Sequence, residues 1–193
     1  MNKRAEQVEA TRQRIVDATV DLHSTVGPAS TTISAIAEEA GVTRLTVYRH
    51  FPDLESLFEA CGQRWAERHP APDPARWPDI RDLEARARHA LGELYGWYRD
   101  SGDELRPILR DLETLPPAVQ QETAEEFQAF ADALVSVSGV RGRARRRLRA
   151  TAGLVVSFFT WHSLTVEQGL DDREAVELAV TLLTCAASTP SRV

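Results

Sequence analysis

Between Gly41 and Phe51 the chain carries a run of side chains that can donate hydrogen bonds or bear positive charge: Thr43, Arg44, Thr46, Tyr48, Arg49 and His50. An arginine can donate two parallel hydrogen bonds to a guanine edge, and tyrosine or histidine can donate to phosphate oxygens. A threonine methyl group or Leu45 can contact the methyl group of thymine. These residue types predict a surface that binds double-stranded DNA.

The elements that position this surface are two short helices joined by a glycine. Ile36, Ala37 and Ala40 share one face before Gly41, which can adopt the positive φ that turns the chain after a helix. Thr43 can then cap the second helix. Because helices this short are marginal in water, both must pack on their neighbours.

This arrangement predicts a helix-turn-helix, whose second helix enters the major groove while the first crosses the DNA backbone. Free N–H groups near Thr32 and Ser34, at the start of the first short helix, suit a phosphate. The competing interpretation is an all-α binding or scaffold module that uses the helix-turn-helix only for packing. The polar side chains of the second helix favour the DNA-binding interpretation, because a packing unit has no need of them.

Hydrophobic periodicity predicts an all-α fold of about nine helices and no strands. The expected helices cover about residues 4–26, 32–41, 43–51, 54–68, 79–99, 103–113, 115–136, 140–168 and 173–187. Four prolines between Pro70 and Pro78 mark the clearest break in the chain. We therefore predict a domain boundary here, with a DNA-binding domain over residues 1–69 and a second helical domain over residues 70–193.

The string AGVTRLTVYRHFPDLESLF, from Ala40 to Phe58, resembles the DNA-binding head of the TetR family of bacterial transcriptional regulators. The resemblance covers about residues 12–61 and rests on Ile15, Ala18, Gly27, Thr32, Ile36, Ala37, Ala40, Gly41, Val42, Thr46, Val47, Tyr48, His50, Phe51 and Leu57. The family often has a lysine shortly after the phenylalanine, where this chain has Pro52 to Glu55. The phosphate contact of that lysine is therefore missing here or made by a backbone N–H.

The resemblance implies a homodimeric, ligand-responsive regulator, usually a repressor, that a small apolar or amphipathic effector releases from a palindromic operator. The last helices would form the dimer interface, for which apolar stripes suggest Val155, Phe159, Val166, Val176, Ala179, Val180 and Leu183. Aromatic residues on three expected helices would line the effector pocket, with His162 as a polar anchor: Trp97, Tyr98, Phe127, Phe130, Phe158 and Trp161. An ordinary filled core explains the same aromatic residues equally well.

The arginines, cysteines and histidines outside the predicted sites are interpreted as structural or solvent-exposed residues. The arginine-rich segment 141–149 is interpreted as a solvated helix start that pairs with Glu122, Glu125 and Glu126, in preference to a second nucleic-acid site. Cys61 and Cys185 are interpreted as buried, inert thiols. The histidines have no metal-ligand spacing, so no metal or other cofactor is expected.

The charge distribution also limits the function. Residues 1–50 carry six basic and six acidic groups, so the net charge of −6 belongs to the rest of the chain. A nucleic-acid-binding surface is therefore confined to the N-terminal region. No phosphate loop or nucleophile motif indicates an enzyme. Without a signal peptide or an apolar run of membrane-spanning length, the chain is expected to be cytoplasmic and free of membrane.

Overall fold

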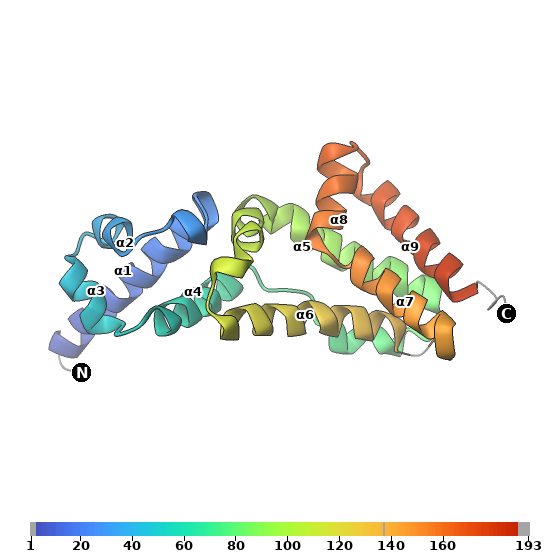
Figure 1. Cartoon of the computed structure of the whole chain (residues 1–193), viewed down its shortest axis with the longest axis horizontal. Helices are drawn as coiled ribbons and strands as arrows, with labels where there is room; N and C mark the ends of the chain where they lie inside the picture. The colour runs from blue at the N-terminus through green and yellow to red at the C-terminus, as the bar shows by residue number, and fades with distance from the viewer. Residues whose placement is uncertain (1–2, 137, 189–193) are drawn as a thin grey trace. The chain divides into compact units, whose positions relative to one another are not determined.

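The computed structural model describes residues 3–136 and 138–188. This part of the chain contains α-helices and short helical turns but no β-strand, which confirms the predicted all-α class (Figure 1). Contacts divide the chain into two compact units. The first comprises residues 1–70 and 101–122, and the second comprises residues 71–100 and 123–193. The predicted domain boundary at residues 69 and 70 stays a prediction, and residues 101–122 group with the N-terminal unit.

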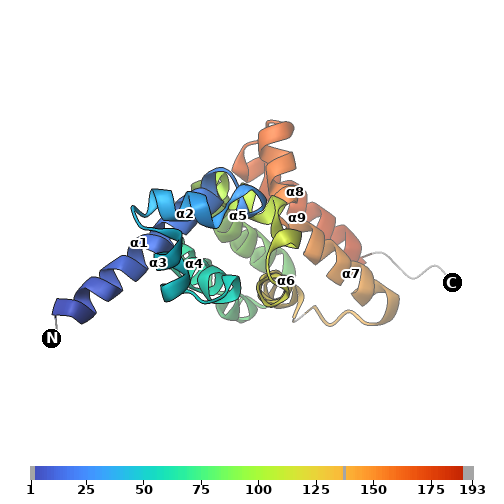
Figure 2. The same ribbon diagram turned by 60° about the vertical axis from the view of Figure 1, so that its left-hand side comes forward.

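The first unit begins with four helices, which we call the head: α1 (Lys3–Thr25), α2 (Ile33–Glu39), α3 (Arg44–His50) and α4 (Leu54–Arg68). Helix α1 packs against α2 and α4, and α2 packs against α3 (Figure 2). A compact apolar core includes Ile15, Ile36, Val47 and Leu57, each almost fully buried. Burying a side chain of this size contributes about 1.5–3 kcal/mol, so tertiary packing stabilises helices that are too short to persist alone.

Ion pairs join the outer surfaces of α1 and α4. Arg64 Nε lies 2.9 Å from the Asp17 carboxylate, and Arg68 Nη2 lies 2.7 Å from the same oxygen. Burial acts to raise the pKa of Asp17, but hydrogen bonds from Arg64 and Gln13 and the charges of Arg64 and Arg68 together hold it below its usual value. These partly exposed pairs add orientation more than stability.

After the head come a 3-10 turn, η2 (Pro74–Asp79), and the long helix α5 (Leu83–Arg110). The prediction of two helices over 79–99 and 103–113 was wrong, because α5 runs through Ser101 and Gly102 without a break. Both residues are buried, and packing outweighs the cost of about 1 kcal/mol that glycine imposes inside a helix. A short turn, η3 (Leu112–Thr114), then leads into α6 (Pro117–Val135).

The second unit continues with α7 (Gly142–Val155), α8 (Phe158–His162), the π-helical turn η4 (Ser163–Glu167) and α9 (Asp172–Ser188). Helices α7 and α9 pack side by side (Figure 1). The single long helix predicted over 140–168 was wrong, because α7 ends at Val155. Tyr95 and Tyr98, both on α5, donate their hydroxyls to the carbonyls of Val155 and Val156, which satisfies backbone groups at the helix end.

A buried arginine ties the start of α5 to the end of α6. The Arg86 side chain is fully buried and donates hydrogen bonds to three carbonyl oxygens, those of Ile80, Arg81 and Leu134. Burial lowers the pKa of Arg86 relative to its ordinary value. The three acceptors offset the cost of taking the guanidinium out of water, so this residue has a structural role.

Candidate nucleic-acid interface

The turn between α2 and α3 forms as the sequence predicts. Gly41 has φ of 63°, and two hydrogen bonds close the end of α2: Gly41 N–H to the Glu38 carbonyl at 3.0 Å and Val42 N–H to the Ala37 carbonyl at 2.8 Å. This pair of bonds satisfies carbonyls that the helix end leaves open. The turn therefore fixes the direction in which α3 leaves α2.

Threonine side chains cap both short helices. The Thr32 hydroxyl accepts a hydrogen bond from Ala35 N–H at 3.1 Å, and the Thr43 hydroxyl accepts one from Thr46 N–H at 3.2 Å. The hydroxyls of Thr43 and Thr46 also lie 2.9 Å apart. Each hydroxyl can make further hydrogen bonds, so capping leaves them available to a ligand.

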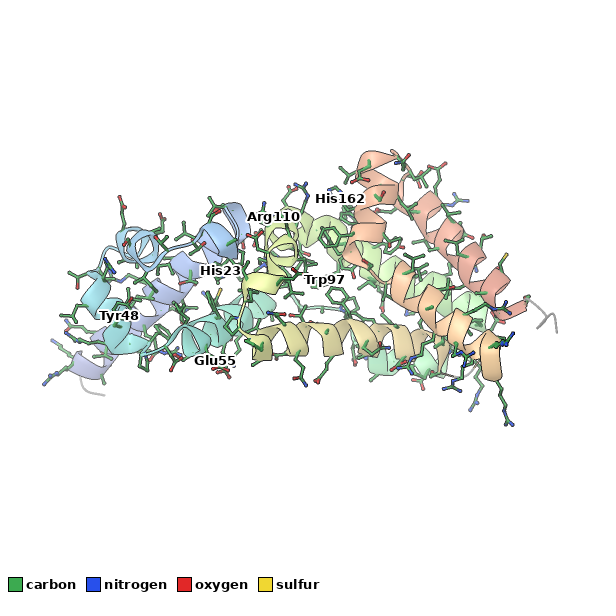
Figure 3. The ribbon with its side chains drawn as sticks, viewed as in Figure 1. His23, Tyr48, Glu55, Trp97, Arg110 and His162 are labelled. Atoms are coloured by element: carbon green, nitrogen blue, oxygen red, sulfur yellow. The ribbon has the colours of Figure 1, made fainter. Side chains whose placement is uncertain are left out.

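One buried residue anchors α3 while its other side chains face outward. Val47 is completely buried in the head core. Among the residues predicted to contact DNA, Thr46 and His50 are half-buried and the others are exposed: Thr32, Ser34, Thr43, Arg44, Leu45, Tyr48 and Arg49. Figure 3 shows Tyr48 on this helix. An exposed Leu45 beside arginine and hydroxyl groups offers both apolar and polar contacts to a groove floor.

Two arginines of α1 lie beside this helix pair and were missed in the sequence-based site. The Arg12 guanidinium stands over the Phe51 ring, 4.9 Å from its centroid, at the end of α3. The Arg14 guanidinium lies close to the Gly41 turn. The α1 sequence alone does not indicate this, because the position of both arginines depends on how α1 crosses the helix-turn-helix.

The start of α4 carries negative charge where the family resemblance would place a lysine. The Asp53 carboxylate caps α4 by accepting a hydrogen bond from Ser56 N–H at 2.7 Å, and that bond lowers the pKa of Asp53. Glu55 is exposed in the first turn (Figure 3). Both carboxylates repel phosphate, so the positive side chains of α1 and α3 must carry the electrostatic attraction.

The aromatic residues proposed for an effector site gather inside the second unit. The Tyr98 ring contacts Phe158 edge-on with centroids 5.4 Å apart, and it also contacts Trp161 and Trp97. His162 adjoins Phe158 and Trp161 at the end of α8 (Figure 3). We call these five residues, Trp97, Tyr98, Phe158, Trp161 and His162, the aromatic cluster.

Phe127 and Phe130 contact each other on α6, and Phe130 also contacts Trp77 of η2, which the predicted site omitted. Phe130, Tyr98 and Phe158 are almost fully buried. A filled core and a ligand site both remain compatible with this packing.

The predicted dimer interface stays a prediction, and its residues differ in how far they are buried within one chain. Five of its seven residues are buried within a single chain, where α9 packs against α7: Val155, Val176, Ala179, Val180 and Leu183. Phe159 and Val166 alone of that set are exposed. An apolar stripe on a helix is buried by its nearest partner, and here that partner belongs to the same chain.

The thiols differ from one another. Cys61 is buried, and burial raises the pKa of its thiol to about 12, which keeps it protonated and unreactive. Cys185 is exposed, so the prediction that it is buried was wrong.

In the described part of the chain, no three His, Cys, Asp or Glu side chains gather as metal ligands, and no helix is long and apolar enough to cross a membrane.

Comparison with known proteins identifies the region that holds the helix-turn-helix. Residues 15–61 match the family model described as bacterial regulatory proteins, tetR family. These residues are therefore similar to the DNA-binding region of the tetR family. A stretch of 56 residues of this chain is 43% identical to the HTH-type transcriptional regulator AcrR of Shigella flexneri, covering 29% of this chain and 26% of AcrR. A stretch of 58 residues is 47% identical to the HTH-type transcriptional regulator SrpR of Pseudomonas putida, covering 30% of this chain and 27% of SrpR.

The match therefore spans about a quarter of the length of these two curated relatives. Both are transcriptional regulators, which agrees with the prediction that the chain is not an enzyme. Solved structures extend the likeness in fold to nearly the whole chain. A tetR-family regulator from Streptomyces coelicolor has a TM-score of 0.59 at 23% identity, covering 92% of this chain and 79% of that one. The regulator FadR of Bacillus subtilis, in complex with stearoyl-CoA, has a TM-score of 0.51 at 17% identity, covering 91% and 97%.

Proposed function

We propose that this protein is a ligand-responsive transcriptional regulator, a repressor that binds a palindromic DNA operator as a homodimer. The observation that carries the DNA-binding proposal is the exposed polar face of α3, held outward by the buried Val47. A helix used only for packing would bury such a face. The match of residues 15–61 to the tetR family supports the same function.

Arg44 is the first residue to test for base recognition. Arg44→Ala should reduce the preference for the operator over a scrambled duplex, because one bidentate contact to guanine contributes about 1–3 kcal/mol of discrimination. Fluorescence anisotropy with labelled DNA from upstream of the protein's own gene measures this preference. Arg149→Ala, an exposed arginine of the second unit, is the matched control and should leave it unchanged.

Tyr48 tests the phosphate contacts. Tyr48→Phe should weaken binding to all duplexes alike, and the salt dependence should stay the same because no charge is removed. Wild-type protein that shows no preference for any duplex over random competitor DNA, at low salt and without effector, would contradict the proposal. That result would favour the alternative, an all-α binding or scaffold module.

We also propose a two-fold dimer through the face of α7 and α9 that their mutual packing leaves open. Five large apolar side chains are exposed on α7, α8, η4 and α9: Leu154, Phe159, Val166, Leu178 and Leu182. Leu178 and Leu182 lie one turn apart on α9, so they form a stripe that a symmetry-related copy can cover. This set replaces the buried residues that the sequence suggested and retains Phe159 and Val166.

Adjacent leucines on α9 distinguish this interface from the core. Leu182 is 41% exposed, whereas Leu183 is fully buried. Leu182→Asp should keep its helical circular dichroism but sediment as a monomer, while Leu183→Asp should lose folded structure in the second unit. A Leu182→Asp protein that still sediments as a well-folded dimer would place the interface elsewhere.

The proposed effector is a small apolar or amphipathic molecule that binds at the aromatic cluster. Support comes from the clustering of Tyr98, Phe158 and Trp161 beside His162, where aromatic walls meet one titratable group. The relative crystallised with stearoyl-CoA carries an amphipathic ligand, which is consistent with this class. A compound that raises the melting temperature must also weaken DNA binding if it favours the released state.

A further inference from the structure

The end of α1 is held by two residues that follow one another at the end of α5. The Asp111 carboxylate accepts a hydrogen bond from the backbone N–H of Ala29 at 3.1 Å. Arg110 Nη2 donates to the carbonyl of Val26 at 3.1 Å, and the same guanidinium binds Asp111 at 2.7 and 2.9 Å. These contacts join segments more than 80 residues apart, and all of them lie within the first unit.

Gly27 allows the two segments to approach this closely. Its φ of 93° is a conformation that other residues rarely adopt. A Cβ placed on Gly27 would lie 2.3 Å from Arg110 Nη2 and 2.3 Å from Asp111 Oδ2. Another residue at this position would strain the backbone and push the Arg110 and Asp111 side chains away from their present contacts. We call Gly27, Ala29, Arg110 and Asp111 the latch.

The negative charge of the latch is almost withdrawn from water, while Arg110 is half-exposed. The Asp111 side chain is 9% exposed. The Arg110 hydrogen bond is the main cause that holds the pKa of Asp111 below its usual value, so the carboxylate stays ionised at neutral pH. A charge-assisted hydrogen bond to a backbone N–H is stronger than a neutral one. Ala29, in the turn η1 (Pro28–Ser30) that leads from α1 to α2, is thus fixed to the end of α5.

The head is attached to the remaining chain by two kinds of connection. One is the covalent segment that follows α4, which is rich in proline. The other is the set of contacts to residues 101–122, which includes the latch and the pair formed by His69 and Glu104, 2.9 Å apart. A body attached at one point can swivel, whereas attachment at two separated points fixes its orientation. Loss of the latch would therefore free the head to turn without unfolding it.

We propose that Asp111 is a positioning residue for DNA recognition: by holding Ala29 and the Gly27 turn, it fixes the orientation of the helix-turn-helix and so sets the half-site spacing that the dimer accepts. This inference rests on the proposed function as a dimeric DNA-binding protein. Two heads held rigidly bind two half-sites at one spacing only, because the second binding event gains its effective concentration only when the geometry fits. Heads that swivel accept several spacings and bind each one less tightly.

The experiment compares the affinity for the operator with that for operators whose centre is longer or shorter by two base pairs, about a fifth of a helical turn. Wild-type protein should prefer the native spacing by about tenfold or more. Asp111→Ala should reduce that preference to about twofold, while its affinity for a single half-site and its salt dependence stay at the wild-type values. Asp132→Ala, which removes the exposed partner of Arg149 in the second unit, is the matched control.

A second variant covers the case in which Asp111→Ala folds poorly. Arg110 is half-exposed, so Arg110→Gln removes the bond to Val26 at little cost to the core, and it should relax spacing in the same direction. Wild-type spacing preference in both variants would overturn the inference, because a purely structural role predicts lower melting temperature with unchanged spacing.

Failure of the proposed function gives a different result, in which wild-type protein prefers no duplex at all. The latch is then judged by amide hydrogen exchange of residues 26–32. Asp111→Ala should accelerate exchange there at least tenfold relative to Asp132→Ala, and equal exchange in the two variants would overturn the latch itself.

Discussion

The head exposes its candidate functional residues, whereas the second unit buries most of its own. In the head, α3 buries Val47 and turns Arg44 and Tyr48 outward. In the second unit, Tyr98 and Phe158 are themselves part of the buried interior. A DNA-binding surface and an enclosed aromatic site therefore face different constraints, since the first has to be exposed and the second has to be filled, either by side chains or by a ligand.

The two regions also differ in whether nearby or distant residues decide where a helix begins or ends. The short helices α2 and α3 of the head are each capped by a threonine that accepts a hydrogen bond from an N–H three residues further along, as with Thr32 and Thr43. In the second unit, α7 ends where hydroxyls of α5 arrive from about 60 residues away. Substitutions in the head should consequently act on DNA binding, and substitutions in the second unit should act on stability and ligand response.

The largest expected effect comes from a charge placed in each core. Val47→Asp should cost several kcal/mol and abolish specific DNA binding, because the buried carboxylate has no partner. Leu148→Asp should do the same to the second unit, where Leu148 is also fully buried. Thermal unfolding followed by circular dichroism and tryptophan fluorescence should show that each variant loses its own region first. Simultaneous loss of both regions in either variant would contradict their independence.

An effect of intermediate size is expected in the head, where the stability of the fold should depend on pH through His23. His23 is buried beside Cys61, its Nδ1 lies 3.6 Å from the Cys61 sulfur, and burial lowers the pKa of His23 to about 4 despite the opposing charge of Asp111. The unfolded chain binds this proton near pH 6.5 and the folded chain does not. Stability should therefore fall as the pH drops from 6.5 to 4, by up to about 3 kcal/mol.

The variant His23→Phe, which retains a ring beside Phe58, should flatten this pH dependence. Urea unfolding at pH 7, 5.5 and 4.5 measures the slope. The pKa of Asp111 is lowered, so its contribution is lost only at more acidic pH and does not interfere. An unchanged slope in His23→Phe would assign the pH dependence to other groups.

Replacing one tyrosine by phenylalanine in each region should have a smaller effect, and it separates a loss of stability from a loss of DNA binding. Tyr98→Phe removes the hydroxyl that donates to the buried Val156 carbonyl, which should cost about 1–3 kcal/mol in urea unfolding. Tyr48→Phe, on the exposed face of α3, should leave stability unchanged and weaken DNA binding. Equal stability losses at the two positions would mean that the hydroxyl of Tyr98 is not what satisfies the end of α7.

The smallest expected effect concerns the missing lysine at the start of α4. Glu55→Lys replaces repulsion of phosphate by attraction, and should raise DNA affinity a few-fold at low salt with a steeper salt dependence. It also removes a favourable charge at a helix N-terminus, at about 0.3–1 kcal/mol. Glu59→Lys, one turn further along α4, gives the same net charge. If both variants gain equally, the gain reflects net charge and not a contact at this position.

Much of the head was predictable because its signals are short-range. The cap at Thr43 and the positive φ of Gly41 were expected from residue type, and the structure confirms them. A cap acts within one helical turn, so the sequence around it contains the information needed. The missed arginines at positions 12 and 14 illustrate the limit, since their location depends on the crossing of two helices.

The sequence by itself determined the helical class, the helix-turn-helix and the outward residues of α3, because periodicity and capping act over a few residues. Tertiary structure alone decided three other features. It selected which apolar stripe of α9 is buried by α7 and which leucines stay exposed, it ended α7 beneath the hydroxyls of Tyr95 and Tyr98, and it brought Asp111 to Ala29. Each of these depends on contacts between segments far apart in the chain, and a pattern read along one segment does not contain the identity of its partner.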